Sequence, residues 1–294
     1  MPLKVRIDTS FIKPLLKYLK ELNTENLRLL TEHPAALRTH QHAVRFGNTK
    51  KPIMEFWKEL LKKYENNSKA VIERIKSGLN YIYNEQSSFS EMMNELNNYA
   101  PNGLNVSTNL FTIIGYDTGI VSEGTALVSL DHNLYLNNPE ELLYMSMHEL
   151  HHVIYTAYNE MFRMADIRMT NHLVELIRYC THLEGLGVYV PYALRKRNKA
   201  FTNDDYKIFQ NKKLRQKRVS EFFGILTKYE TEPVRSIHDK DWKILDLMTG
   251  KKRLWYIAGA HIAEAIENSS GREVLNETIR LGPEEFFRQY HESL

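Results

Sequence analysis

Two histidines and a glutamate stand at a spacing that suits metal-dependent hydrolysis. They belong to the string His148-Glu149-Leu150-His151-His152. Residues four apart in a helix lie on one face and one turn from each other, so the imidazoles of His148 and His152 can reach one ion. Imidazoles placed in this way are typical zinc ligands, at about 2.0–2.1 Å each.

Glu149 follows the first histidine directly, so in a helix it points away from the line that joins the two imidazoles. Its carboxylate therefore need not occupy a coordination position and can accept a proton from a water molecule that the ion holds. Zinc lowers the pKa of such a water towards about 7. Glu149 is predicted to act as the general base at neutral pH.

A zinc site needs a third protein ligand, and the first candidate is Glu184 near the end of the next predicted helix. An antiparallel helix pair would bring that end back to the level of the motif helix. Gly185 and Gly187 would let the backbone turn sharply after it. His182 and Glu175, which lie on other faces of the same predicted helix, are the alternative ligands.

An HExxH string followed by a glutamate ligand in a later helix resembles the gluzincin branch of the zincin metallopeptidases. Residues 146–152 and 183–187 are similar to strings in uncharacterised bacterial and archaeal families of zinc-dependent peptidases. The resemblance extends from about Gly115 to the C-terminus and implies a Zn²⁺-dependent hydrolysis of peptide or protein substrates. Gluzincins commonly place an acid four residues after the glutamate ligand, where this chain has Val188. The group that orients the first histidine must therefore come from elsewhere.

The same resemblance implies two further features of the site. A strand ahead of the motif helix offers its edge to an extended substrate backbone, and residues 125–130 are placed to do so. A tyrosine near the metal hydrogen-bonds the oxyanion, and Tyr256 in the segment 255–259 matches that position. His261, about one turn further on, is the alternative for this role.

The residues around the motif predict a helix that begins near Asn138 and extends to about Tyr158. Asn138 can cap this helix, Pro139 suits its first turn, and the two acids that follow favour the positive end of the helix dipole. A second helix is predicted over about residues 166–183, with its end at Gly185 or Gly187.

The first hundred residues have the apolar periodicity of amphipathic helices, and residues 204 onward are predicted to be helical, with breaks near 233, 250, 271 and 282. Residues 106–116 and 125–130 are the only segments that predict strands. We therefore expect a mostly helical α+β protein. A helical N-terminal part would span residues 1–100, and a zincin-like catalytic domain with a small sheet would span residues 101–294.

The composition is that of an ordinary soluble globular protein, with 43% hydrophobic and 26% charged residues. The net charge of +3 gives no reason to expect a polyanionic partner. Neither a signal peptide nor an apolar run long enough to span a membrane is evident, so a cytoplasmic location is expected. The single cysteine, Cys180, excludes an intramolecular disulfide framework.

Residues 195–197 and 212–218 form a basic block behind the metal motif. A solvated helix face is the simplest interpretation of such a block, and contact with a nucleic acid is the other. The alternative function is therefore that of a helical nucleic-acid-binding protein whose metal site is structural or incidental. Binding to DNA or RNA that weakens steeply with salt would favour this alternative.

Overall fold

The computed structural model describes residues 3–294, which divide into two compact units. The first unit comprises residues 3–94 and 105–153, and the second comprises residues 95–104 and 154–294. The boundary expected at residue 101 does not separate these units, because the first unit takes in residues on both sides of it.

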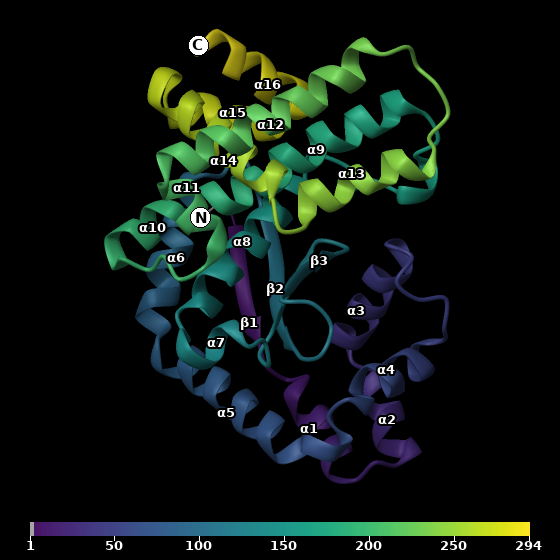
Figure 1. Cartoon of the computed structure of the whole chain (residues 1–294). Helices are drawn as coiled ribbons and strands as arrows, with labels where there is room; N and C mark the ends of the chain where they lie inside the picture. Colours follow the sequence, from purple (N-terminus) through teal and green to yellow (C-terminus); the bar gives the residue numbers. More distant parts are fainter. Residues whose placement is uncertain (1–2) are drawn as a thin grey trace. The chain divides into compact units, whose positions relative to one another are not determined.

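The first unit contains a four-stranded sheet with the strand order β1-β2-β4-β3. Its strands β1, β2 and β3 are labelled in Figure 1. Strands β1 (Leu3–Asp8), β2 (Val106–Ile113) and β4 (Thr125–Ser129) are parallel, whereas β3 (Gly119–Ser122) runs antiparallel to β4. Strand β1 corrects the expectation that the first hundred residues are entirely helical. Its apolar residues alternate with Lys4 and Arg6, which is the pattern of a half-buried strand.

A strand does form at residues 125–129, but its predicted position at the edge of the sheet is wrong. Strand β4 is internal and pairs with β2 on one side and β3 on the other. Strand β3, which lies in a segment where no strand was expected, forms the edge. The chain reverses from β3 into β4 through Glu123 and Gly124, whose φ angles are 49° and 67°. Two consecutive positive φ values are typical of the tight turns that join antiparallel strands.

Helices accompany this sheet, and the predicted mostly helical α+β class is confirmed. Helix α3 contacts β2, β3 and β4. Its start and end agree with the sequence signals, since the His33 side chain accepts a hydrogen bond from Ala35 N and Gly47 follows the helix with a φ of 71°. The helices that begin in this unit are α1 (Ile12–Lys20), α2 (Thr24–Thr31), α3 (Pro34–Arg45), α4 (Ile53–Lys62), α5 (Ser68–Asn84), α6 (Gln86–Asn98), α7 (Leu134–Asn137) and α8 (Glu141–Thr156).

The second unit is helical, with α14 packed against most of its other helices (Figure 1). Breaks fall near Pro233, Gly250, Gly271 and Gly282, as expected. Its helices are α9 (Thr170–Tyr189), α10 (Tyr192–Asn198), α11 (Asp204–Gln210), α12 (Lys212–Thr231), α13 (Asp239–Thr249), α14 (Leu254–Ser270), α15 (Arg272–Leu281) and α16 (Pro283–Glu292).

Helix α9 does not end at its glycines but continues to Tyr189, so the sharp turn expected after Glu184 is wrong. Gly185 instead lies against the backbone of α14. A Cβ atom added at Gly185 would lie 2.3 Å from Cα of Gly259, and one added at Gly259 would lie 2.1 Å from the carbonyl oxygen of Thr181. These glycines therefore allow two helix backbones to touch.

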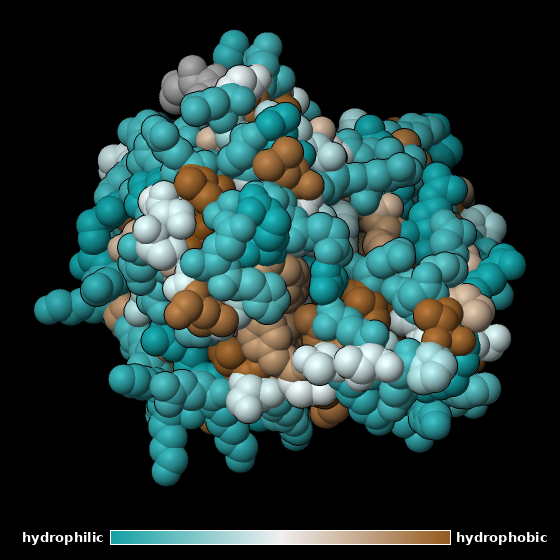
Figure 2. All heavy atoms as spheres, turned by 90° about the horizontal axis from the view of Figure 1, so that it is seen from above, coloured by the Kyte–Doolittle hydropathy of each residue, from teal (hydrophilic) through white to brown (hydrophobic). Residues whose placement is uncertain are grey.

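No helix among residues 3–294 is long and apolar enough to cross a membrane. On the face drawn in Figure 2, hydrophilic residues predominate and apolar residues gather in small groups. The exposed large apolar side chains come from separate parts of the chain, for example Leu22, Leu136 and Val234. Isolated exposed residues of this kind are normal in globular proteins.

The α9–α14 contact predicts how alanine substitutions will affect stability. Gly259→Ala should lower the free energy of unfolding by about 1–3 kcal/mol, because the new methyl group meets backbone that cannot rotate away. Gly224→Ala is the matched control, since Gly224 lies in α12 with no neighbour within 4 Å of an added Cβ. It should keep or raise the free energy of unfolding, by up to about 1 kcal/mol. Urea denaturation measures both, and equal stabilities would contradict the assigned contact.

Candidate metal centre

Helix α8 brings His148, Glu149 and His152 into one cluster. One ligand atom from each of the three side chains lies within 4.8 Å of the others. The ring centroids of His148 and His152 are 4.4 Å apart, with the ring planes inclined by 72°. The helical spacing read from the sequence thus places both imidazoles on one side of α8.

The donor chemistry of this cluster fits a zinc ion. Imidazole nitrogens and carboxylate oxygens are the groups with which proteins bind zinc. The cluster is largely buried, since Glu149 is 5% and His152 is 7% exposed. A divalent cation would offset the free-energy cost of burying the Glu149 carboxylate. His148 and His152 are therefore suitable ligands for such an ion.

The Glu149 side chain also lies against the edge strand β3. A Cβ atom added at Gly119 would lie 2.5 Å from Oε1 and 2.6 Å from Cγ of Glu149. No role was predicted for Gly119, since only residues 106–116 and 125–130 were expected to form strands. A glycine directly before the β-branched residues Ile120 and Val121 is a signal for close approach within a strand.

Two residues of β3 direct their backbone polar groups away from the sheet. The amide of Ser129 donates to the carbonyl oxygen of Thr118 at 2.9 Å, which makes these two residues a hydrogen-bonded pair. Because such pairs alternate in an antiparallel ladder, Gly119 and Val121 point their N–H and C=O groups to the side opposite β4. These backbone groups therefore take no part in the ladder between β3 and β4, and they lie on the strand that borders Glu149.

In the second unit, Glu184 and Tyr256 share one electrostatic environment. Burial raises the pKa of the Tyr256 phenol, and the negative charge of Glu184 raises it further. The guanidinium of Arg253 lies 3.4 Å from the centre of the Tyr256 ring and donates two hydrogen bonds, of 2.7 and 2.6 Å, to the carboxylate of Asp205. The face of Tyr256 is therefore held by a guanidinium that is itself fixed.

The two alternative ligands on α9 have other surroundings. His182 is fully buried, with Nδ1 3.2 Å from the Tyr155 hydroxyl and Nε2 3.1 Å from the Thr278 hydroxyl. Its ring stacks on Phe286 at 4.1 Å, and burial holds its pKa well below the usual value. These contacts make His182 a core histidine with both ring nitrogens engaged. Glu175 is exposed.

His261, the alternative to Tyr256, also has different neighbours. Burial lowers the pKa of His261, the positive charge of Arg215 lowers it further, and Glu264 acts in the opposite direction. Its ring lies 6.0 Å from that of Tyr290. The negative charge of Glu184 raises the pKa of Tyr256, whereas Arg215 and Glu264 are the charges that act on His261.

The basic block is partly neutralised within the second unit. Arg195 is buried and stacks on the ring of Tyr206 at 4.0 Å. Lys212, Lys213 and Lys217 are exposed. Three further arginines form ion pairs, namely Arg215–Glu264, Arg218–Glu221 and Arg197–Glu95. This arrangement favours a solvated helix face over a surface for a polyanion.

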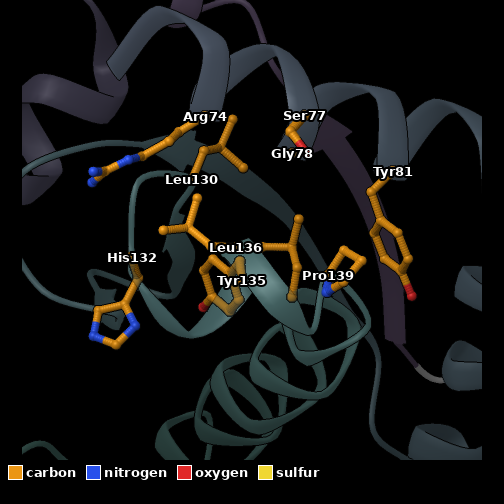
Figure 3. A pocket seen from close by; sticks show the side chains of 10 residues that line it. Arg74, Ser77, Gly78, Tyr81, Leu130, His132, Tyr135, Leu136 and Pro139 are labelled. Atoms are coloured by element: carbon orange, nitrogen blue, oxygen red, sulfur yellow. The ribbon is translucent and has the colours of Figure 1, made fainter. Parts of the chain in front are cut away.

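A small hollow in the first unit lies apart from this chemistry (Figure 3). One wall comes from α5, with Arg74, Ser77, Gly78 and Tyr81, and apolar side chains that include Leu130 face it. The walls are close together, since a Cβ atom at Gly78 would lie 3.1 Å from Cδ2 of Leu130. Of its lining residues only His132 is a usual metal ligand, so the hollow lacks a cluster that could hold an ion.

Comparison with known proteins identifies the family of the chain. A family model described as "Putative zinc dependent peptidase (DUF5700)" matches residues 22–294. No curated protein and no solved structure matches the chain. Because the match spans nearly the whole sequence and contains the cluster on α8, the chain belongs to the family that this description names, DUF5700.

Proposed function

We propose that this protein is a zinc metallopeptidase of the gluzincin type with a zincin-like core. The observation that carries the proposal is the largely buried cluster of His148, Glu149 and His152 on α8. The family description, which names a zinc-dependent peptidase, supports the same conclusion.

The proposed ligands are His148, His152 and Glu184, of which Glu184 is the least constrained by the motif. Three protein ligands and one open position are the usual set of a catalytic zinc site. Two observations favour Glu184 over its rivals on α9. Both ring nitrogens of His182 already have hydrogen-bonding partners, and Glu175 is exposed.

When bound, zinc would supply a Lewis acid that polarises the substrate carbonyl and makes the attacking water more acidic. Glu149 is the proposed general base. Its carboxylate takes a proton from the attacking water and later passes that proton to the nitrogen of the leaving amine. The largely buried position of Glu149 favours this transfer, because electrostatic interactions are stronger where water is excluded.

The proposed substrate is an extended peptide that pairs with the edge of β3. Gly119 and Val121 would supply the backbone N–H and C=O groups for that pairing, beside the Glu149 side chain. Since β3 has only four residues, the pairing would involve a short stretch of substrate.

Tyr256 is the proposed donor to the oxyanion. A tyrosine phenol is protonated at neutral pH, and the raised pKa of Tyr256 is in the same direction, so the hydroxyl can donate a hydrogen bond. The stacked Arg253 restricts the motion of the ring.

The first prediction of this proposal concerns metal content. Purified protein should hold about one zinc ion, and His148→Ala or His152→Ala should lose it, because the ligands that remain bind weakly. His291→Ala, which changes an exposed histidine on α16, is the control and should keep the ion. Elemental analysis of the dialysed variants measures the outcome. Full zinc retention in both motif variants would exclude the site.

The second prediction separates metal binding from proton transfer. Glu149→Gln keeps the size of the side chain and removes the base, so zinc should remain while peptide hydrolysis falls by roughly 10²–10⁴-fold. Glu175→Gln makes the same chemical change at an exposed position and should leave the rate unchanged. A wild-type rate for Glu149→Gln would show that the assigned mechanism is wrong.

The third prediction tests the third ligand. Glu184→Ala should weaken zinc binding by more than about 100-fold. His182→Ala should lower the zinc affinity by at most about 10–100-fold, which is the effect of a residue outside the ligand set. His182→Ala should instead lower the free energy of unfolding, by about 1–3 kcal/mol, because it leaves the hydroxyls of Tyr155 and Thr278 without this partner.

Competition with a chelator at fixed pH measures both zinc affinities, with Glu175→Ala as the control for loss of an acid from α9. A larger loss of zinc affinity in His182→Ala than in Glu184→Ala would remove the gluzincin assignment. The peptidase proposal would then rest on HExxH and the family alone.

A further inference from the structure

The backbone conformation at Gly119 does not require a glycine. Its φ angle is outside the positive range in which glycine is favoured, and it lies in a regular strand. Glycine weakens a strand interior, because it loses more conformational entropy on folding and packs no side chain. Its presence at this position therefore needs another reason.

The reason is the Glu149 side chain. The three atoms nearest to a Cβ added at Gly119 are Oε1, Cγ and Cδ of Glu149, at 2.5, 2.6 and 2.7 Å. Ordinary contact between carbon atoms begins at about 3.5 Å, so a methyl group at this position would have to displace the carboxylate by about 1 Å. The neighbouring atoms belong to a flexible side chain, in contrast to the backbone atoms that surround Gly185. An alanine would consequently move Glu149 and leave the fold intact.

We infer that Gly119 is a positioning residue for the general base. The Glu149 carboxylate lies in the space that a side chain at position 119 would fill. The backbone of Gly119 limits how closely the carboxylate can approach β3. This inference rests on the proposed function, in which Glu149 takes the proton from the attacking water.

The same glycine links the base to the substrate. In the proposed complex, the N–H and C=O groups of Gly119 pair with the substrate backbone, while its Cα borders the Glu149 carboxylate. One residue would thus fix the position of the peptide and the position of the base relative to each other. A misplacement of about 1 Å can reduce a rate by about 10²-fold, so the link has a measurable consequence.

The expected effect of Gly119→Ala is a loss of turnover without a loss of metal. The value of kcat for a peptide that the wild-type protein cleaves should fall by about 10²-fold. Zinc affinity should stay at the wild-type value, because His148 and His152 are not the groups that the methyl displaces. Gly224→Ala is the matched control, because it makes the same chemical change in α12 where no atom lies within 4 Å of the new Cβ, and its kcat should be that of the wild type.

A double-mutant cycle tests whether Gly119 acts through Glu149. Glu149→Ala removes the three atoms that lie nearest to the new methyl group. Gly119→Ala should therefore cause no further loss of kcat in the Glu149→Ala background. In zinc-free protein, Gly119→Ala should lower Tm in the wild type, and it should lower Tm less, or raise it, in the Glu149→Ala background. This second measurement does not depend on activity.

Several results would overturn the inference. They are a wild-type kcat for Gly119→Ala, a further loss of kcat in the Glu149→Ala background, or a shift in Tm that is the same in both backgrounds. Failure of the proposed function has a different signature. The wild-type protein would then cleave no peptide, while the Tm cycle would still show the coupling between Gly119 and Glu149.

Discussion

The contact between the backbones of α9 and α14 at Gly185 and Gly259 is the constraint on which the second unit depends. Each glycine in a helix interior costs about 1 kcal/mol relative to alanine, so the contact has to return at least that much through close packing. Because no side chain separates the helices at this point, their distance is set by van der Waals contact between rigid backbone atoms and not by side-chain rotamers. Glu184 directly precedes one contact residue, and Tyr256 lies about one turn before the other. The helices that carry Glu184 and Tyr256 thus lie close together here, and the negative charge of Glu184 adds to the burial that raises the pKa of Tyr256.

The first unit uses a glycine for a different physical purpose. At Gly119 the space left by the absent side chain is filled by the carboxylate of Glu149 and not by another backbone. A contact between two backbones determines stability, since neither partner can move aside. A contact between backbone and a flexible side chain determines instead where that side chain lies. Substitution by alanine should therefore lower stability where two backbones touch, and it should displace the side chain at Gly119. These different effects distinguish the two kinds of glycine.

The sequence predicted the parts of the fold and of the candidate site that depend on local interactions. The caps and the apolar periodicity predicted α8 and hence the approach of His148 to His152. Strand β1 was missed although its apolar residues alternate with Lys4 and Arg6, because its partner β2 lies about a hundred residues away and the pairing depends on contacts between distant segments. The edge position was assigned to β4 and not to β3, since strand order depends on contacts between distant segments. Gly119 was missed for the same reason.

The glycines of α9 were misread because one residue type serves two purposes. Gly271 and Gly282 end helices and have φ angles of 88° and 93°, whereas Gly185 lies inside a helix and has no positive φ. The residues that follow distinguish the two cases. After Gly185 the apolar pattern continues through Leu186 and Val188, both buried, so the helix still has a face to bury. After Gly271 and Gly282 come residues typical of a new helix start, with acids in its first turn. A glycine inside a continuing apolar pattern thus indicates close packing, and a glycine before a new helix start indicates an end.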